Sequence, residues 1–430
     1  MSMENSIGIG LLGAGTVGGA LVRRLVGESD AIALKTGLTF DVRKIGISRL
    51  DRERDFEVTE GLLTDDPFEV VNDPTVDIVV EVMGGKDPAG DLILAALEAG
   101  KPVISANKEL IAARGPELIA AAERAGVPFL FEAAVGGGIP IIRPLSETLA
   151  GETLDRVIGI VNGTTNYILT EMEAGATYLT ALEQATDLGY AEPDPTADVS
   201  GADAAAKAAI LASLAFGTWV DPSDVYTEGI EELTAVDMSF AAELGYVVKL
   251  VAVCERKDAG VNARVHPAMV PKDHPLASIR GATNAVFIEG AAIDSLLFAG
   301  PGAGGDPTAT AVLGDVIDAA RETLAGAQVA PRIRFSPGEI VPFTDIPTRW
   351  YVRLQVDDQP GVLAKIAASF GDEEVSIRSV WQEGVDQEAA LIVVTHQAPE
   401  SAQRAALATI TAIPEVIEVA SVIRVLGASK

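Results

Sequence analysis

A glycine-rich turn near the N-terminus restricts the folds open to this 430-residue chain. The residues GAGTVG (13–18) match G-x-G-x-x-G, follow the apolar run IGIGLLG (7–13) and precede a helix expected over 16–26. A strand, a glycine turn and a helix in this order are typical of a dinucleotide-binding βαβ unit. Further apolar runs, each a candidate strand, occur at 42–48, 77–84, 101–106 and 127–135. Strands that alternate with helical patterns predict a parallel sheet with helices on both faces, a Rossmann-type α/β domain.

The positions of this turn have separate expected roles in holding a cofactor. Gly13 permits the tight turn, Gly15 lets the backbone approach a pyrophosphate, and Gly18 allows the helix to pack closely on the strand. Thr16 and Val17 open the helix, whose N-terminus favours an anion. The turn therefore predicts a site for a nicotinamide dinucleotide.

The residues after the second candidate strand bear on the choice between NAD and NADP. An acidic residue there would bind the ribose 2′-hydroxyl, whereas an arginine would accommodate a 2′-phosphate. Arg49 occupies the deciding position, with Arg52 and Arg54 close by. We expect NADP, and Asp51 keeps NAD possible.

Composition and charge exclude several classes of partner. The net charge of −30 argues against nucleic acid and against anionic membranes. No apolar run reaches the roughly 18 residues that a membrane span needs. The single cysteine, Cys254, excludes an intrachain disulfide framework and suits a reducing compartment. A cytoplasmic protein is expected.

The hydrophobic pattern changes twice along the chain. Residues 146–300 mix helical and β-rich runs, which predicts an α+β domain. A glycine-rich loop then leads into a helix, so that about 300–340 return to the first domain, residues 1–145. The tail, 349–430, follows the order βαββαβ, which predicts a small ferredoxin-like domain.

The stretch GYAEPDPTADVSGADAAAK (189–207) carries the strongest chemical signal. Asp203 and Lys207 are four residues apart, so they share one face of a helix that is otherwise almost wholly apolar. Such a helix is usually buried, and a buried charge costs several kcal/mol unless it is partnered. An amine near carboxylates in a dry site is a candidate acid or base. A surface ion pair is the alternative.

Three further segments offer candidate ligands. Lys108 comes just after a strand, at the sheet edge where open α/β sheets bind ligands, although an ordinary lysine in the first turn of a helix would fit the pattern equally well. Glu132 and the three glycines that follow it would suit either a hard cation or a hinge. The segment NGTTNYIL (162–169) would bind a carboxylate at a helix entrance or simply cap that helix.

Two other loops contain candidate functional residues. Gly302 lies in a second glycine-rich loop that would close over the cofactor. The prolines of HPAMVPKDHPLAS (266–278) predict an irregular loop. The three histidines share no metal-ligand spacing.

Taken together, these motifs resemble the homoserine dehydrogenases that carry a C-terminal ACT regulatory domain. The segments that carry the resemblance are GLLGAGTVGGAL, VISANKELIA, FEAAVGGGIPII, VNGTTNYIL, GYAEPDPTADVSGADAAAK and GAGGDPTATAV. They cover about residues 5–345, and DDQPGVLAKIA (357–367) resembles the ACT signature.

The resemblance implies reversible NAD(P)-dependent interconversion of L-aspartate 4-semialdehyde and L-homoserine, a step toward threonine, methionine and isoleucine. It implies that Lys207 donates the proton and that Lys108 contacts cofactor or substrate. The implied substrate ligands are Glu192, Asp198, Asp203, Gly163 and Thr164. The implied ligands of a monovalent cation, Na⁺ or K⁺, are Glu132, Val135, Gly137 and Ile139, mostly through backbone carbonyls. The resemblance also implies that residues 146–300 form the substrate-binding, catalytic and dimerisation domain of a homodimer or homotetramer, which threonine inhibits through the ACT domain.

Two other functions remain open from the residues alone. One is a related reductase of another amino-acid aldehyde, because glycine-rich loops do not distinguish substrates. The other is a non-catalytic nucleotide-binding amino-acid sensor, which the presence of Lys207 and Asp203 argues against.

Overall fold

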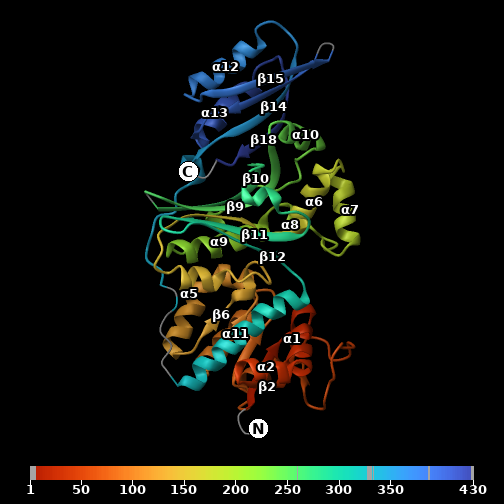
Figure 1. Cartoon of the computed structure of the whole chain (residues 1–430), viewed down its shortest axis with the longest axis vertical. Helices are drawn as coiled ribbons and strands as arrows, with labels where there is room; N and C mark the ends of the chain where they lie inside the picture. The colour runs from red at the N-terminus through yellow and green to blue at the C-terminus, as the bar shows by residue number, and fades with distance from the viewer. Residues whose placement is uncertain (1–5, 259, 327–331, 333, 386–387, 428–430) are drawn as a thin grey trace. The chain divides into compact units, whose positions relative to one another are not determined.

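The computed structural model describes residues 6–258, 260–326, 332, 334–385 and 388–427 (Figure 1). These residues form two compact units, each built from separate stretches of the chain. The first unit comprises Met1–Leu154, Ala209–Pro222 and Asn284–Pro337. The second comprises Asp155–Ala208, Ser223–Thr283 and Gly338–Lys430. Among the described residues, no helix combines the length and the apolar character needed to cross a membrane.

The first unit contains the predicted parallel sheet, with strand order β3-β2-β1-β4-β5-β6. Its strands are β1 (Ser6–Leu12), β2 (Thr39–Gly46), β3 (Leu63–Thr64), β4 (Ile78–Glu81), β5 (Val103–Ser105) and β6 (Phe129–Leu130). The order reverses direction between β1 and β4, which is where open α/β sheets bind ligands at their carboxyl edge. The prediction of a Rossmann-like fold is therefore confirmed.

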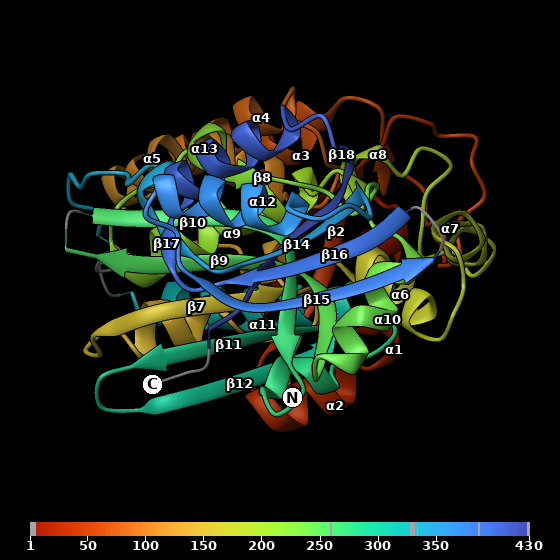
Figure 2. The ribbon, with the colours of Figure 1, turned by 90° about the horizontal axis from the view of Figure 1, so that it is seen from above.

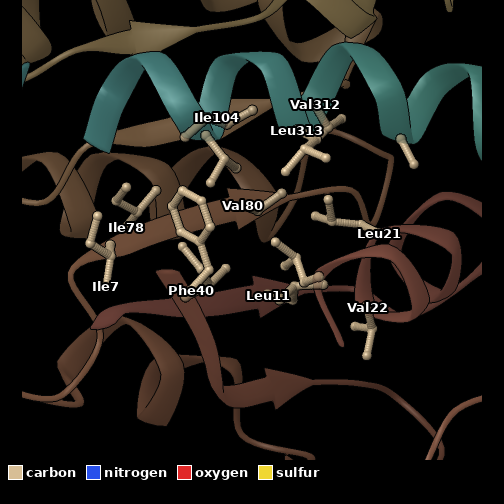
Figure 3. Close-up of a cluster of buried hydrophobic side chains, with 14 of the residues drawn as sticks. Ile7, Leu11, Leu21, Val22, Phe40, Ile78, Val80, Ile104, Val312 and Leu313 are labelled. Atoms are coloured by element: carbon tan, nitrogen blue, oxygen red, sulfur yellow. The ribbon is translucent and has the colours of Figure 1, made fainter. Parts of the chain in front are cut away.

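Helices cover both faces of this sheet, because its strands are apolar on both sides. One face packs against α1 (Thr16–Gly27), α2 (Ser29–Thr36) and α11 (Gly305–Ala325). The other packs against α3 (Pro67–Asn72), α4 (Ala89–Glu98) and α5 (Lys108–Ala125). Figure 3 shows Val312 and Leu313 of α11 on the same core as Leu11 and Val80 of the sheet. A helix from late in the sequence thus completes the N-terminal fold.

The last strand of this sheet is shorter than the apolar run 127–135 suggests. The strand β6 ends at Leu130, and a 3₁₀ turn over Glu132–Ala134 follows it. This turn packs against α11, and the backbone N–H of Glu132 donates to the carboxylate of Asp315 on that helix, at 2.8 Å. The strand ends early because the backbone N–H of Glu132, two residues beyond Leu130, bonds to a helix and not to another strand.

The second unit is built on a long, mostly antiparallel sheet with the order β7-β9-β10-β18-β14-β16-β15. Its strands are β7 (Leu154–Ile160), β9 (Tyr246–Lys257), β10 (Gly260–Pro271), β14 (Trp350–Asp357), β15 (Ile377–Val385), β16 (Glu388–Thr395) and β18 (Val416–Val425). A two-residue strand, β8 (Tyr226–Thr227), also pairs with β10. Figure 2 shows β15 and β16 side by side, in agreement with their antiparallel pairing.

The remaining elements are short strands and helices. The helices that begin in the second unit are α6 (Gly163–Glu173), α7 (Tyr178–Asp187), α8 (Thr196–Val199), α9 (Ala202–Phe216), α10 (Ala235–Glu243), α12 (Val362–Asp372) and α13 (Glu400–Thr411). The strands β11 (Thr283–Gly290) and β12 (Asp294–Pro301) are neighbours, and β13 (Pro347–Thr348) pairs with β17 (Ala398–Pro399).

The irregular loop predicted at 266–278 is wrong in its first half, because residues up to Pro271 belong to β10. On one side, β10 pairs continuously with β9. On the other side its partner changes: β8 pairs as far as Val265, and β18 begins at Ala268. Pro267 lies between these two partners, so a residue without an N–H is tolerated in a central strand.

The tail has the element order strand, helix, strand, strand, helix, strand (β14, α12, β15, β16, α13, β18), with the short β17 before α13. Its four main strands lie in the order β18-β14-β16-β15. The helices α12 and α13 pack on this sheet through a shared apolar core, and Figure 1 shows both on the same side of it. The strand β18 also pairs with β10, so the tail shares its sheet with the rest of the second unit.

Candidate functional site

The glycine turn stands at the carboxyl end of β1 and is tightly packed at both ends. Gly13 has a φ of 104°, and a Cβ there would lie 2.9 Å from the Cα of Met83. A Cβ at Gly18 would lie 2.3 Å from the carbonyl oxygen of Gly13. At Gly15, by contrast, a Cβ would meet no atom within 4 Å. The turn therefore leaves open space at the one glycine expected to face a pyrophosphate.

The helix that follows the turn presents free backbone donors. The N-cap of α1 is Gly15, which has no side chain to satisfy them, and the first intrahelical bond runs from Gly19 N to Gly15 O. The N–H groups of Thr16, Val17 and Gly18 thus have no partner within the helix. Such an N-terminus binds phosphate or another anion.

The loop after β2 is held over the glycine turn by an arginine. Arg54 donates to the carbonyl of Ala14 at 2.8 Å and to the carbonyl of Arg49 at 2.9 Å. Arg49 itself is exposed, three residues beyond the end of β2. Two guanidinium groups therefore lie at the end of the second strand, where a ribose would be recognised.

Lys108 is the first residue of α5 and follows β5 at the carboxyl edge of the sheet. The side chain of Asn107 caps this helix by accepting from Leu110 N at 3.1 Å. The same side chain donates to the carbonyl of Gly85 at 2.6 Å. Lys108 therefore lies at the carboxyl edge of the sheet. It follows β5, the neighbour of β4, and the strand order reverses between β4 and β1.

A buried carboxylate joins two strands at this edge of the sheet. Glu81, at the end of β4, is fully buried and accepts from Ser105 Oγ at 2.7 Å and from Met83 N at 2.9 Å. Burial raises the pKa of Glu81, although these hydrogen bonds favour its charged form. The ends of β4 and β5 are therefore tied together by a side chain that does not face solvent.

Three backbone N–H groups bind the carboxylate of Glu132. It accepts from Ile141 at 2.5 Å, Ile142 at 2.8 Å and Arg143 at 2.9 Å. These bonds involve both carboxylate oxygens and hold the side chain against residues 141–143. Arg143 also pairs with Asp315 at 2.8 Å, while burial raises the pKa of Asp315 to about 7.

The other expected cation ligands, Val135, Gly137 and Ile139, lie on the glycine turn that follows. Gly137 has a φ of 56°, and a Cβ there would lie 2.4 Å from the carbonyl oxygen of Gly302. Across the described ranges, no group of three or more His, Cys, Asp or Glu side chains is placed to hold a metal ion. A cation site here would consist mainly of backbone carbonyl oxygens, and the expectation that Glu132, Val135, Gly137 and Ile139 hold a monovalent cation stays a prediction.

An amine and two acids meet in the second unit. Lys207 Nζ lies 2.7 Å from Asp203 Oδ2 and 2.7 Å from the carbonyl oxygen of Val161. Asn162 Nδ2 donates to Asp203 Oδ2 at 2.9 Å and to Asp198 Oδ1 at 2.6 Å. The side chains of Lys207 and Asp203 are only 12% and 9% exposed, so this is not a solvated surface pair. One ammonium and two carboxylates give this acid–amine cluster a net negative charge.

The orientation of Asn162 follows from its place in the chain. It comes two residues after β7 and is the N-cap of α6, where its Oδ1 accepts from Thr165 N at 2.9 Å. Because the oxygen caps the helix, the amide nitrogen must face the acids. The segment 162–169 was predicted to bind a carboxylate or to cap a helix, and Asn162 does cap α6. Its contacts with Asp198 and Asp203 were not predicted.

The remaining predicted residues are spread over both units. Gly163 and Thr164 open α6 directly after Asn162, and Thr164 Oγ1 donates to the carbonyl of Tyr190 at 2.6 Å. Glu192, two residues further on, is exposed. Gly302, in the first unit, packs so tightly on Asn284 that a Cβ would lie 2.0 Å from its side chain.

Comparison with known proteins relates both sets of residues to one family. Residues 140–317 match the family model described as Homoserine dehydrogenase, and residues 13–132 match the model of its NAD binding domain. A homoserine dehydrogenase of Mycobacterium tuberculosis is 48% identical over 436 residues, covering 99% of this chain and 98% of that protein. The chain belongs to the homoserine dehydrogenase family.

Solved structures of homoserine dehydrogenases agree with this membership. One from Thiobacillus denitrificans is 40% identical, with a TM-score of 0.93 over 98% of each chain. A hyperthermophilic archaeal homoserine dehydrogenase in complex with NADPH is 29% identical, with a TM-score of 0.60 over 76% of this chain. The chain is therefore an oxidoreductase with an NAD(P)-binding domain, and its acid–amine cluster lies within the segment that matches the homoserine dehydrogenase model.

Proposed function

We propose that this chain catalyses the NADP(H)-dependent interconversion of L-aspartate 4-semialdehyde and L-homoserine. The observation that carries the proposal is the acid–amine cluster of Lys207, Asp203, Asn162 and Asp198. Its net negative charge suits a substrate that carries an ammonium group, and its amine suits a substrate oxygen whose charge changes during the reaction.

The two acids have the role of holding the substrate. Asn162 Nδ2 donates to Asp198 Oδ1 and to Asp203 Oδ2, so both carboxylates face the same amide. A substrate ammonium would donate to carboxylates such as these. Glu192, exposed at the start of the same loop, adds a third carboxylate to attract and hold a cationic substrate.

Lys207 has the role of proton donor in aldehyde reduction and proton acceptor in the reverse direction. Within the described part of the chain its hydrogen bonds go to Asp203 and Val161, which use two of the three donors of an ammonium. The third donor is left for the substrate oxygen. When bound, the nicotinamide cofactor exchanges a hydride with the substrate carbon, and the ammonium of Lys207 stabilises and protonates the oxygen.

The cofactor would be held by the first unit. The open space at Gly15 and the free N–H groups of α1 suit its pyrophosphate, and Arg49 with Arg54 suits a 2′-phosphate. The archaeal family member solved with NADPH supports NADP over NAD. Lys108 lies at the sheet edge where it would contact cofactor or substrate, and Gly302 would complete the site from the second glycine-rich loop.

A monovalent cation, Na⁺ or K⁺, would be held by the backbone carbonyls of Glu132, Val135, Gly137 and Ile139. Carbonyl oxygens are suitable ligands for such ions. A positive φ at Gly137 allows the chain to turn sharply there, which brings successive carbonyls of one short segment close together. The ion would fix this turn and take no part in proton transfer.

The tail would act as an ACT regulatory domain that binds threonine. Support comes from a pocket of about 490 Å³ lined by residues 356–363 together with Gln382 and Leu391. The pocket includes the segment that resembles the ACT signature, and Gln382 Nε2 donates to Asp358 at 3.0 Å across it. Carboxylate and amide groups at its wall suit the polar groups of a small amino acid.

The oligomeric state and the cellular location of the protein are also part of the proposal. We expect a homodimer or homotetramer, because β12 and β15 are edge strands within the described residues and edges favour pairing. A cytoplasmic location is supported by the single cysteine.

The test is to mix the protein with aspartate semialdehyde and to follow the absorbance of reduced nicotinamide. We expect turnover with a faster rate for NADPH than for NADH, a dependence on Na⁺ or K⁺, and inhibition by threonine. Absence of turnover in folded protein with the cation present would contradict the proposed reaction. Turnover without threonine inhibition would contradict only the regulatory role.

A further inference from the structure

A buried ion cluster connects the tail to the rest of the second unit. Arg424 on β18 is only 5% exposed, and its guanidinium contacts Glu228 and, at 2.7 Å, Glu400. Glu400 is fully buried and also accepts from Thr348 Oγ1 at 2.7 Å and Trp350 Nε1 at 2.9 Å. Burial opposes the charge of Arg424, but the two carboxylates outweigh it and raise its pKa. Arg424 therefore stays charged inside the unit and depends on both acids.

Aromatic rings and a tyrosine hydroxyl complete this environment. The guanidinium of Arg424 lies 5.6 Å from the ring centre of Tyr226, 5.7 Å from that of Phe343 and 5.4 Å from that of Trp350. Tyr226 also donates to Glu228 Oε2 at 2.8 Å. Glu228 is thus held by a cation and a hydroxyl together.

The backbone at Glu228 lies against the loop that carries the substrate acids. Ile230 N donates to the carbonyl of Val199 at 2.9 Å. A Cβ at Gly229 would lie 2.2 Å from that same carbonyl oxygen and 2.7 Å from the Cα of Ser200. On the other side, a Cβ at Gly201 would lie 3.1 Å from Thr227 Cγ2. Residues 227–230 and 199–201 are therefore in close contact, and Gly229 leaves no room for a side chain between the two segments.

The segment 199–201 is the direct link between Asp198 and the start of α9, which carries Asp203 and Lys207. We infer that Arg424 and Glu228 are positioning residues for the reaction, which hold Asp198 and Asp203 at the distances that the acid–amine cluster requires. This inference rests on the proposed function, since that function makes the cluster the substrate site. It assigns an effect on substrate binding to a residue of the tail.

The test begins with Glu228→Gln, which keeps the size of the side chain and an acceptor for Tyr226 but removes the charge that pairs with Arg424. We expect KM for homoserine to rise about tenfold, in the range of couplings carried through packed networks. The pH profile of kcat should shift, because Asp198 moves relative to the Asp203–Lys207 pair on α9. KM for NADPH should stay the same, since the cofactor residues belong to the first unit. Glu228→Asp retains the charge and should recover part of the loss.

Arg353→Gln is the matched control. Arg353 on β14 pairs with the fully buried Asp237 of α10 at 2.9 Å, so it joins the same two parts of the unit through a different contact. We expect this variant to lower Tm about as much as Glu228→Gln while leaving KM for homoserine and the pH profile unchanged. Equal effects of both variants on KM would overturn the inference, because they would reflect general loosening of the tail.

Hydrogen exchange separates this inference from the proposed function. In Glu228→Gln the amide of Ile230 should exchange faster than in the wild type, and in Arg353→Gln it should not. If the wild type turns over no homoserine, the proposed function fails, yet faster exchange at Ile230 would still support the positioning contact. Unchanged exchange at Ile230 in Glu228→Gln would overturn it.

Discussion

Asn162→Asp changes a single atom of the acid–amine cluster, and its effect can be estimated from two distances. Aspartate caps a helix as well as asparagine does, so Thr165 N keeps its acceptor. The amide nitrogen that donates to Asp198 at 2.6 Å and to Asp203 at 2.9 Å becomes an oxygen that accepts only. The substitution therefore tests the donor without changing shape.

The new carboxyl will bind a proton. Charged, it would face two carboxylates, and each repulsion at these distances costs about 6 kcal/mol at an effective dielectric constant of about 20. Protonating a carboxyl with an ordinary pKa near 4 costs only about 5.5 kcal/mol at about pH 8. The bound proton supplies a donor to one acid and leaves the other without its charge-assisted hydrogen bond, which is worth about 1.5–3 kcal/mol.

We expect kcat/KM for homoserine at about pH 8 to fall roughly 10- to 150-fold, the range that corresponds to this loss. The deficit should grow as pH rises, because the new carboxyl loses its proton once the pH passes its raised pKa and then repels both acids. The free energy of unfolding of the variant, relative to the wild type, should also fall as pH rises. A carboxyl whose pKa is raised in the folded state loses its stabilising contribution as pH rises through that pKa. Initial rates and Tm measured across pH give both trends.

Asn166→Asp, one turn further along α6, is the control. Asn166 Nδ2 donates to the carbonyls of Gly281 and Thr283, and its Oδ1 accepts from Lys249. The same chemical change therefore destabilises the fold without adding charge to the acid–amine cluster. If Asn162→Asp stays within about twofold of the wild type across pH, or if Asn166→Asp gives the same kinetic profile, the reasoning is refuted.

Three further predictions concern single side chains. Lys207→Ala should lower kcat about 100-fold or more, and Lys207→Arg should not restore it because a guanidinium does not readily release a proton; near-normal turnover of either variant would contradict the assigned role. Arg49→Ala should raise KM for NADPH about tenfold with little effect on NADH, as expected for a lost phosphate contact; equal effects on both cofactors would argue against a 2′-phosphate site. Burial lowers the pKa of Lys249 to about 8, so above that pH the unfolded chain binds a proton that the folded chain has released. The unfolding free energy of the wild type should therefore rise relative to Lys249→Met by up to about 3 kcal/mol between pH 8 and pH 10.5, and parallel curves would refute this.

The parts of the fold that could be predicted depend on local pattern. The glycine turn and the alternation of apolar runs with helices were sufficient for the parallel sheet, because each strand and helix of a βαβ unit follows the last in sequence. The face shared by Asp203 and Lys207 followed from helical spacing alone. These features require no knowledge of distant contacts.

The features that were missed depend on contacts between distant segments. Asn162 joins the acid–amine cluster because β7 ends beside the start of α9, which no local pattern reveals. The carboxylate of Glu132 accepts from three backbone N–H groups nine to eleven residues later, contacts that no local pattern reveals. Pro267 suggested a loop because the gap between β8 and β18 is visible only in the assembled sheet.

The position of β18 has a consequence for how the protein is made. This strand follows every other strand of the described chain, yet it lies between β10 and β14. During synthesis one side of β10 therefore stays largely unpaired until more than a hundred further residues, up to β18, have left the ribosome. An exposed strand edge invites pairing with other chains. We expect chains that stop before Val416 to aggregate rather than to accumulate as a soluble intermediate. Chains that include β18 should stay soluble.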